Sequence, residues 1–336
     1  MSRNNQSLTD VRVSLVVLPE AAASTVISLY DVLNMVHLVA PGKVRFWPQL
    51  VGDLRGPVMT MSSIALDIQT TYEQVKQTHI IMVPSLFLPN DCWPAGKYQR
   101  LTTWLRHSYE AGAILCSACT GVFPLLETGL FENESVTCHW AYAAILRRTY
   151  PNAKLCIDKT LVITGREQNL VMSGASGSWQ DLALYLIERF SGPATANSVA
   201  KFFLLSRHPD GQTAYVTFIE DTSHGDAEIA RVQAWLSNRW RDTESMEQLA
   251  QLAHMSERTF KRRFKNATGY APMDYLQHLR IEHAKQYLEN SAMPIDEIAA
   301  AVGYREPAFF RNLFKRITTL TPSAYRAKFR SPLLSA

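Results

Sequence analysis

The 336-residue sequence lacks a long uninterrupted apolar segment. No run approaches the ~18 apolar residues that a membrane-spanning helix needs. The first six residues, Met-Ser-Arg-Asn-Asn-Gln, also lack the apolar core of a signal peptide. These absences exclude a protein built on membrane-spanning helices and argue against secretion. We therefore expect a cytoplasmic protein with no membrane partner.

Cysteines are few and unevenly spaced: Cys92, Cys116, Cys119, Cys138 and Cys156. The number is odd, and the single C-x-x-C formed by Cys116 and Cys119 has no second pair to complete a zinc site. An apolar strand that carries both residues more often holds buried, inert thiols than a metal or a disulfide. We therefore expect no metal and no cofactor, with a redox role as the minor alternative.

A strong net charge is also missing, since 34 Lys+Arg against 30 Asp+Glu leave only +4. The balance is uneven along the chain. Residues 231–330 hold 17 basic and 10 acidic side chains, or +7, and residues 1–230 hold 17 and 20, or −3. A basic module joined to a slightly acidic one suggests that only the C-terminal part meets a polyanion.

The polar, turn-rich segment at residues 219–227 has the composition of a linker between two domains. Before it, apolar runs alternate with helical patterns, as at 80–83 followed by 98–110 and at 113–118 followed by 122–126. This alternation predicts an α/β domain with a doubly wound, mainly parallel, flavodoxin-like sheet. After it, no strand-like run occurs, which predicts an all-α domain. The expected divisions are a disordered 1–10, a first domain at 11–218, a linker at 219–228, a second domain at 229–330 and a tail at 331–336.

An internal repeat fills the second domain. Residues 260–280 and 310–330 align at an offset of 50, with identities such as Phe264/Phe314, Lys265/Lys315 and Tyr275/Tyr325. A match of this extent indicates a duplicated structural unit. Each copy has a short amphipathic helix, at 246–253 or 295–302, then a turn and a second helix. A longer helix at 273–289 joins the copies. This is the layout of two helix-turn-helix units.

The second helix of each copy carries an aromatic stripe on one side and polar side chains on the other. Arg, Lys and Asn on an outward helix face can read base edges in the major groove of double-stranded DNA and hold phosphates. The alternative is an ordinary solvated face, which two copies with equivalent charges make less favoured. The predicted DNA-binding residues are Arg258, Lys261, Arg262, Lys265, Ala308, Arg311, Asn312 and Lys315.

Residues 229–330 resemble the DNA-binding domain of AraC/XylS-family transcription regulators. The resemblance is carried by motifs shared by the two copies and by the closing Thr321-Pro322-x-x-Tyr325-Arg326. Two positions depart from the family pattern, because His254 and Thr319 stand where glycine is usual. We expect a residue in such a position to need positive φ, at some cost in stability for Thr319.

The first domain offers a candidate nucleophile. The segment from Gly112 to Phe123 leads from an apolar strand into a helix across a small-residue turn, which could expose Cys119 beside the helix N-terminus. His139 could lie next to it, and cysteine with histidine is the minimum for thiolate catalysis. Both could equally be well-packed residues of no catalytic use.

Residues 11–206 resemble the PfpI-like, class I glutamine-amidotransferase-like domain that precedes such DNA-binding units in GlxA-like regulators. Active relatives carry an acidic residue where this chain has Ala21, with Glu20 one step away, so the resemblance implies a catalytic set without its third member. We therefore expect no catalytic residues and no enzyme activity. A pocket at the strand ends would instead bind a small-molecule effector. Its candidate residues are Glu20, Ser85, Cys119, Thr120, His139, Trp140 and Ser176.

These expectations describe a DNA-binding transcription regulator, an activator that responds to a small metabolite such as an amino acid or a quaternary amine. The first domain would sense the effector and form a homodimer, and RNA polymerase would be a further partner. The alternative is a cysteine-dependent amidase or protease with a DNA-binding domain.

Overall fold

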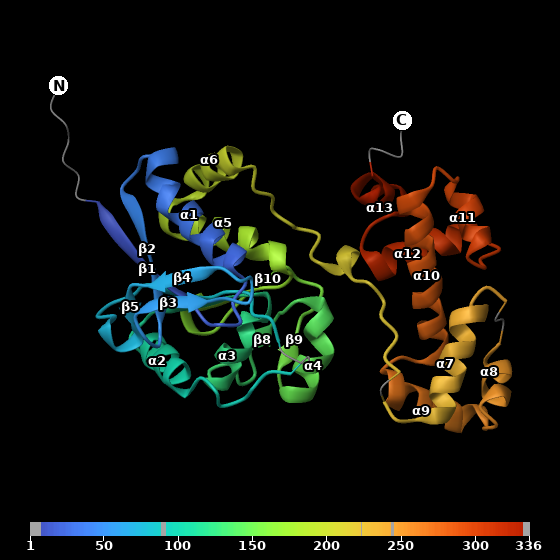
Figure 1. The fold of residues 1–336 in the computed structure, drawn as a ribbon. Coiled ribbons are helices and arrows are strands. Elements are labelled where there is room, and N and C mark those ends of the chain that lie inside the picture. Colours follow the sequence, from blue (N-terminus) through green and yellow to red (C-terminus); the bar gives the residue numbers. More distant parts are fainter. Residues whose placement is uncertain (1–7, 89–91, 223, 243–244, 332–336) are drawn as a thin grey trace. The chain divides into compact units, whose positions relative to one another are not determined.

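The computed structural model describes residues 8–88, 92–222, 224–242 and 245–331. The chain forms two compact units, Met1–Gln212 and Thr213–Ala336 (Figure 1). This division lies before the expected 219–228 linker. The remainder of the expected tail, 332–336, lies outside the described residues.

A seven-stranded sheet forms the centre of the first unit, in the order β10-β11-β7-β6-β1-β2-β5. All neighbours are parallel except β10 and β11, which pair antiparallel. Its strands are β1 (Thr9–Val16), β2 (Val44–Gly52), β5 (Thr70–Thr71), β6 (Ile80–Val83), β7 (Ile114–Ala118), β10 (Leu161–Thr164) and β11 (Leu170–Ser173). Two small sheets pair β3 (Gly56–Met59) with β4 (Ala65–Ile68) and β8 (Ser135–Val136) with β9 (Lys154–Leu155).

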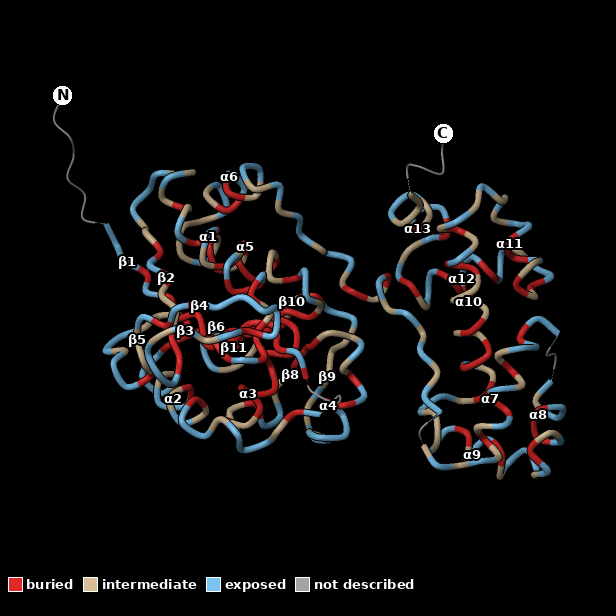
Figure 2. Tube along the Cα trace, in the orientation of Figure 1, coloured by how far each residue is buried: buried red, intermediate tan, exposed pale blue. Residues whose placement is uncertain are grey.

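Helices cover both faces of the sheet (Figure 1). On one face lie α1 (Ala23–Val39), α5 (Trp179–Ser191) and α6 (Pro193–Phe203), and on the other lie α2 (Gln99–Glu110) and α3 (Val122–Glu127), with α4 (Ala143–Thr149) beside β8 and β9. Among the strands between them, β6 is a continuous apolar run that is buried at every position (Figure 2). Burial on two faces requires such runs. The predicted doubly wound α/β class is confirmed.

The first strand begins earlier than expected. The prediction of disorder over residues 1–10 is wrong for Thr9 and Asp10, which pair with Val44 and Arg45 of β2. The Asp10 carboxylate also lies 3.4 Å from the Arg45 guanidinium. Cross-strand pairing of polar residues extends the ladder beyond the apolar run that the sequence shows. Residues 1–7 of that segment lie outside the described residues.

The connections of β1 determine where a ligand site is expected. From β1 the chain passes to β2 on one side, whereas β6 pairs on the other side. The strand order therefore reverses between β1 and β6, and open α/β sheets bind ligands outside the carboxyl ends of strands at such a point. Glu20 follows β1, Ser85 follows β6 and Cys119 follows β7.

The second unit is helical throughout its described part (Figure 1). Its helices are α7 (Ala227–Arg239), α8 (Met246–Leu252), α9 (Glu257–Thr268), α10 (Pro272–Asn290), α11 (Ile295–Ala301), α12 (Pro307–Thr318) and α13 (Pro322–Phe329). The central helix α10 packs against α9 and against α11, α12 and α13. Phe260, Phe264, Phe310 and Phe314 are fully buried, so the repeated aromatic stripes form the core of each helix-turn-helix unit.

The segment before α7 packs on the helical unit. Phe218 makes edge contacts with the rings of Tyr270 and Tyr275 and stacks on His278. The buried Lys285 ammonium donates to the Val216 carbonyl oxygen at 2.5 Å. Val216 and Phe218 were both expected to belong to the first domain, which the sequence placed at 11–218. Within the expected linker itself, the Glu220 carboxylate accepts from the Tyr275 hydroxyl on α10 at 2.7 Å.

Candidate nucleic-acid interface and effector site

The first helix-turn-helix unit consists of α8 and α9. The turn passes through His254, whose φ of 52° confirms the expected positive value. The Ser256 hydroxyl accepts from the Thr259 N–H at 3.4 Å and caps α9. With Phe260 and Phe264 facing the core, Arg258, Lys261, Arg262 and Lys265 are exposed on the outward face of α9.

The second unit, α11 and α12, repeats this arrangement with different turn chemistry. Gly303 supplies the turn at φ 84°, where an added Cβ would lie 3.0 Å from the Arg241 carbonyl oxygen. Pro307 occupies the first turn of α12, and Thr319 ends the helix at φ 67°. The outward face exposes Ala308, Arg311, Asn312 and Lys315.

Most of these outward side chains have no partner within the part of the chain that the structure describes. Arg258, Arg262, Lys265, Asn312 and Lys315 make no hydrogen bond or ion pair there. Two of the outward side chains do have partners: the Lys261 ammonium lies 3.2 Å from the Glu257 carboxylate on its own helix, and the Arg311 guanidinium pairs with Asp296 on α11. The outward faces therefore present donors that DNA can engage.

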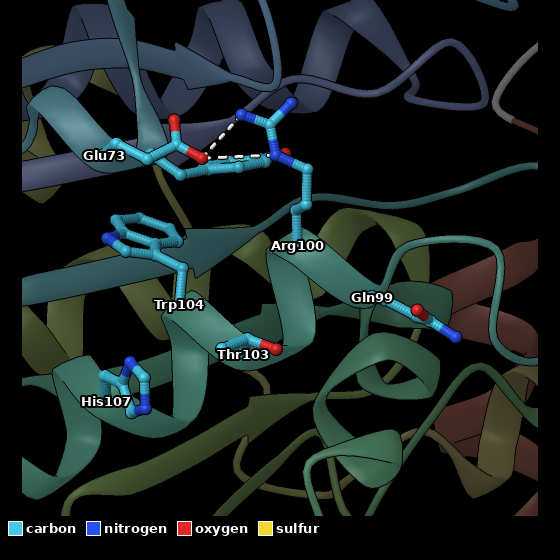
Figure 3. Close-up of a pocket in the computed structure, with 7 residues that line it drawn as sticks. Glu73, Gln99, Arg100, Thr103, Trp104 and His107 are labelled. Atoms are coloured by element: carbon cyan, nitrogen blue, oxygen red, sulfur yellow. Dashed lines mark hydrogen bonds and ion pairs between the residues drawn. The ribbon is translucent and has the colours of Figure 1, made fainter.

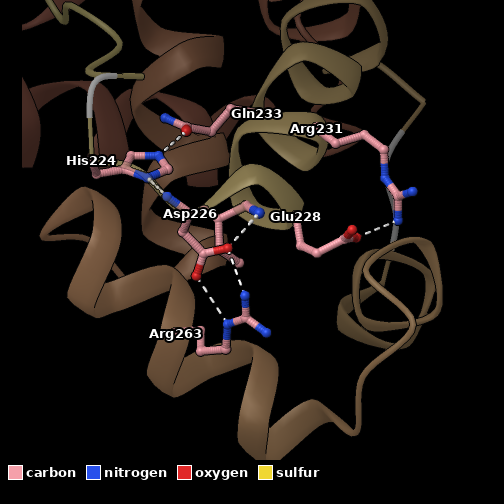
Figure 4. Close-up of polar contacts among 7 residues, drawn as sticks. His224, Asp226, Glu228, Arg231, Gln233 and Arg263 are labelled. Carbon is pink, nitrogen blue, oxygen red and sulfur yellow. Dashed lines mark hydrogen bonds and ion pairs between the residues drawn. The ribbon is translucent and has the colours of Figure 1, made fainter.

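A separate polar network fixes α9 to α7 (Figure 4). The Arg263 guanidinium donates twice to the Asp226 carboxylate, at 2.9 and 2.7 Å, and the same carboxylate caps α7 through the Ile229 N–H. Hydrogen bonds from Arg263 outweigh partial burial and lower the pKa of Asp226. The Asp226 N–H donates to His224 Nδ1, and His224 Nε2 lies 2.7 Å from Gln233 Oε1. Arg263 thus supports the helix and is not one of its outward donors.

Cys119 lies at the carboxyl end of β7 with a φ of 58°. Next to it, a Cβ added at Gly121 would overlap the carbonyl oxygens of Val83 and Pro84, so only glycine permits this close approach of the β6 and β7 turns. The expectation that the turn exposes Cys119 is wrong, since the residue is 3% exposed. The turn places the side chain inward among the neighbouring strand ends.

The Cys119 thiol is surrounded by hydroxyl groups. Its Sγ lies 3.5 Å from Ser176 Oγ, and Thr120 and Ser85 are further hydrogen-bond partners. Burial raises the pKa of the thiol above its ordinary value, against the opposing effect of these hydrogen bonds. A protonated thiol is a weak nucleophile. All five cysteines are free thiols.

His139 does not act on this thiol in the structure. Its Nδ1 accepts the Ala141 N–H at 3.1 Å, which caps a short 3-10 helix, and its ring contacts those of Trp140 and Tyr142. Burial lowers the pKa of the imidazole, which favours the neutral form. Within the described ranges, neither a carboxylate nor Cys119 is hydrogen-bonded to it.

Glu20 is the buried acidic group at these strand ends, with 6% exposure. Its Oε1 accepts from the Lys97 ammonium at 2.6 Å and its Oε2 from the Tyr98 hydroxyl. Burial raises the pKa of this carboxyl, but the hydrogen bonds from Lys97 and Tyr98 outweigh it, and the net pKa is lowered. The Lys97 ammonium also lies 5.0 Å from the Tyr98 ring centroid.

The structure thus brings together five of the seven candidate effector residues. Glu20 and Ser85 come from adjoining turns that exchange backbone hydrogen bonds, and Thr120 Oγ1 accepts the Leu86 N–H at 2.8 Å. Cys119 and Ser176 complete the group, whereas His139 and Trp140 contact each other without hydrogen-bonding to it. The sequence analysis missed Lys97 and Tyr98, which contact Glu20. Their position just before α2 is the only sequence signal that could have placed them near the strand ends.

A pocket of about 440 Å³ lies between α2 and the 3-10 turn Tyr72–Gln74 (Figure 3). The Trp104 ring stacks on Tyr72 at 5.1 Å, and the Arg100 guanidinium lies 2.6 Å from Glu73 and 2.7 Å from Asp53. This pocket contains none of the predicted residues. Its charged groups Arg100 and Glu73 are paired with each other, and Arg100 lies on the helix that begins directly after Lys97 and Tyr98.

Comparison with known families agrees with this geometry. Residues 11–189, more than half of the chain, match the model of the DJ-1/PfpI family. The chain belongs to the DJ-1/PfpI family. Residues 249–328 match the model of a helix-turn-helix domain. The predicted combination of a PfpI-like domain with an AraC-type helix-turn-helix domain is therefore confirmed, and the protein is a DNA-binding transcriptional regulator.

Two relatives of this DJ-1/PfpI-family protein align with it over most of the length of both proteins. The HTH-type transcriptional regulator CdhR of Pseudomonas aeruginosa is 26% identical over 313 residues, 89% of each chain. The HTH-type transcriptional regulator GlxA of Rhizobium meliloti is 25% identical over 280 residues, 81% of this chain and 82% of that protein. A crystal structure of a transcriptional regulator protein from Vibrio parahaemolyticus shares the fold, with a TM-score of 0.51 and 20% identity over 58% of this chain and 99% of that one. Among the described residues, no helix is both long and apolar enough to cross a membrane.

Proposed function

We propose that α9 and α12 read DNA bases and that the first unit is a catalytically inactive sensor for a small cationic metabolite, such as an amino acid or a quaternary amine. The observation that carries the sensor proposal is the environment of Glu20. A buried carboxylate beside an aromatic ring is the chemistry that recognises a cationic nitrogen. Here the Lys97 ammonium occupies that environment, with 49% of its side chain exposed.

An effector with an amine would compete with Lys97 for Glu20. Because Lys97 belongs to the protein, its displacement releases the segment just before α2, and ligand binding then favours a second conformation of the first unit. The two helices proposed to read DNA, α9 (the first reader) and α12 (the second reader), lie in the second unit. Such a change would therefore reach DNA through the chain that joins the two units. We further propose an activator that forms a homodimer through its first unit, works in the cytoplasm where its DNA partner lies, and contacts RNA polymerase.

A thermal-shift screen of the full-length protein tests the effector proposal, with free amino acids and quaternary amines as probes. We expect at least one probe to raise the melting temperature of the wild type and to lose this effect in Glu20→Gln. Glu110→Gln removes an exposed carboxylate at the far end of α2 and should respond as the wild type does. A stabilising probe that acts equally on all three proteins would contradict the role of Glu20.

The second candidate function is a cysteine-dependent amidase or protease. The positive φ of Cys119 at a strand-to-helix turn favours it, because nucleophiles are often held on such turns. The raised thiol pKa and the absence of a hydrogen bond between Cys119 and His139 oppose it. We expect glutaminase, peptidase and glyoxal-hydratase assays to show no rate that depends on Cys119. A robust rate that Cys119→Ser abolishes would replace the sensor by an enzyme.

A further inference from the structure

The second reader carries a charge pair that links two helices. Arg311 on the outward face of α12 pairs with Asp296, which lies in the first turn of α11. The side chains are 48% and 59% exposed, so the pair lies at the surface that the second reader presents. An exposed ion pair of this kind stabilises a fold only weakly. Stability alone is therefore a weak reason for a carboxylate at this place.

The first reader has no counterpart of this cross-helix pair among the described residues. Lys261 corresponds to Arg311 at the repeat offset of 50, and it pairs with Glu257 on its own helix. The i, i+4 spacing lets that pair form in any exposed helix. The Asp296 carboxylate instead holds the Arg311 guanidinium toward α11. The two readers thus hold the corresponding cation differently.

We propose that Asp296 is a positioning residue that makes the second reader selective for its DNA sequence. This inference rests on the proposed role of α12 as a reader. A guanidinium has five N–H donors, so Arg311 can keep one bond to Asp296 and still donate to O6 and N7 of a guanine. Held in this way, Arg311 is not free to turn toward a phosphate on any sequence. On a site without the guanine, the DNA phosphates repel the Asp296 carboxylate and no base contact compensates. This repulsion weakens non-specific binding and so increases specificity.

The adjacent residue Glu297 provides a matched control. It is exposed in the same first turn of α11, and no contact joins it to Arg311. Asp296→Asn and Glu297→Gln each remove one negative charge from the same helix N-terminus, so their effects on overall charge and on the helix dipole are alike. Only the first substitution frees Arg311.

The test measures binding of the full-length protein to a duplex selected from random DNA and to a scrambled duplex. We expect Asp296→Asn to bind the scrambled duplex more tightly and to lower the ratio of specific to non-specific affinity about 10-fold, since the energy of a bidentate base contact is at stake. Its salt dependence on the scrambled duplex should steepen by about one counterion, as Arg311 gains a phosphate. Glu297→Gln should change both affinities by the same factor and leave the ratio unchanged.

Two further measurements separate positioning from a structural role. Single-base variants of the selected duplex should show that Asp296→Asn relaxes preference at one guanine, the position at which Arg311→Ala also loses preference. In the Arg311→Ala background, Asp296→Asn should have no effect on the ratio. The proposal is overturned if Asp296→Asn and Glu297→Gln change the ratio equally, or if the effect of Asp296→Asn persists without Arg311. If Arg262→Ala and Arg311→Ala both bind the selected duplex as the wild type does, the reader assignment itself is wrong.

Discussion

At the scale of single residues, the environment of Cys119 determines what the first unit can do. A buried thiol among three hydroxyl groups remains protonated at neutral pH, because its raised pKa reduces the thiolate fraction. The neutral imidazole of His139 directs Nδ1 to a backbone N–H and cannot take up the thiol proton through that atom. The strained backbone of Cys119 is therefore present without the proton acceptor that nucleophilic catalysis needs.

The pH profile of Cys119 alkylation follows from this environment. A thiol whose pKa is raised forms thiolate only at higher pH, so its reaction with iodoacetamide should have a midpoint above the ordinary thiol value of 9.0. Mass spectrometry of each cysteine-containing peptide gives this profile, with the exposed Cys92 as an internal reference for reagent activity. A Cys119 midpoint near neutral pH would show a thiolate stabilised by a base and would contradict the sensor proposal.

At the scale of elements, the two helix-turn-helix units differ in their turns more than in their helices. Gly269 ends α9 at φ 80°, whereas Thr319 ends α12 at φ 67° and His254 passes through the first turn at φ 52°. A side chain at positive φ costs of order 1 kcal/mol or more. The turns that bound the recognition helices thus lie where the repeat places them, and the positive φ of His254 and Thr319 lowers the stability of the folded state.

Thr319→Gly should stabilise the protein, because glycine adopts this conformation without strain. We expect a gain of about 1 kcal/mol in the free energy of unfolding of the helical unit, reduced by the greater freedom of glycine in the unfolded chain. Denaturant unfolding followed by circular dichroism measures it. Gly269→Ala is the reverse change at the corresponding end of α9 and should destabilise. A neutral or destabilising Thr319→Gly would mean that the Thr319 hydroxyl contributes more than the strain costs.

The network at Asp226 makes a second prediction about elements. Arg263→Ala leaves the Asp226 carboxylate without its guanidinium partner, so α9 should dock less firmly on α7. We expect a loss of roughly 1 to 3 kcal/mol in stability, since a charge-assisted pair of hydrogen bonds is removed. Lys265→Ala, on the outward face of the same helix, should leave stability nearly unchanged while it weakens binding to all DNA sequences. Equal stability losses in the two variants would contradict the assigned faces.

Elements were predictable where the sequence repeats a local pattern. The apolar run at 80–83 became β6 with the same bounds, and the expected helix at 273–289 became α10. The aromatic stripes of Phe260, Phe264, Phe310 and Phe314 predicted which faces are buried. Contacts between distant residues were not predictable. Glu20 meets Lys97 and Tyr98 across 77 and 78 positions, and no local period encodes such a meeting.

At the scale of the whole molecule, a DJ-1/PfpI-family unit, which we propose as the sensor, is joined to a helical unit with two helix-turn-helix motifs. The net charge is +7 in residues 231–330 and −3 in residues 1–230. This uneven charge indicates that DNA, a polyanion, binds the second unit. The pairing of Glu20 with Lys97 is the basis of our proposal that the first unit binds a small cationic ligand. In the proposed regulator such a ligand changes DNA binding only through a difference in affinity between two states.

The central claim, that the outward faces of α9 and α12 read base sequence, is tested most directly by a competition titration. Full-length wild type, Arg262→Ala and Arg311→Ala are titrated at one salt concentration on a duplex selected from random DNA and on a scrambled duplex. We expect each arginine variant to lose ~1 to 3 kcal/mol of binding free energy on the selected duplex and much less on the scrambled one, with relaxed preference at a few base pairs. If both variants bind the selected duplex as tightly as the wild type, these helices are not the readers.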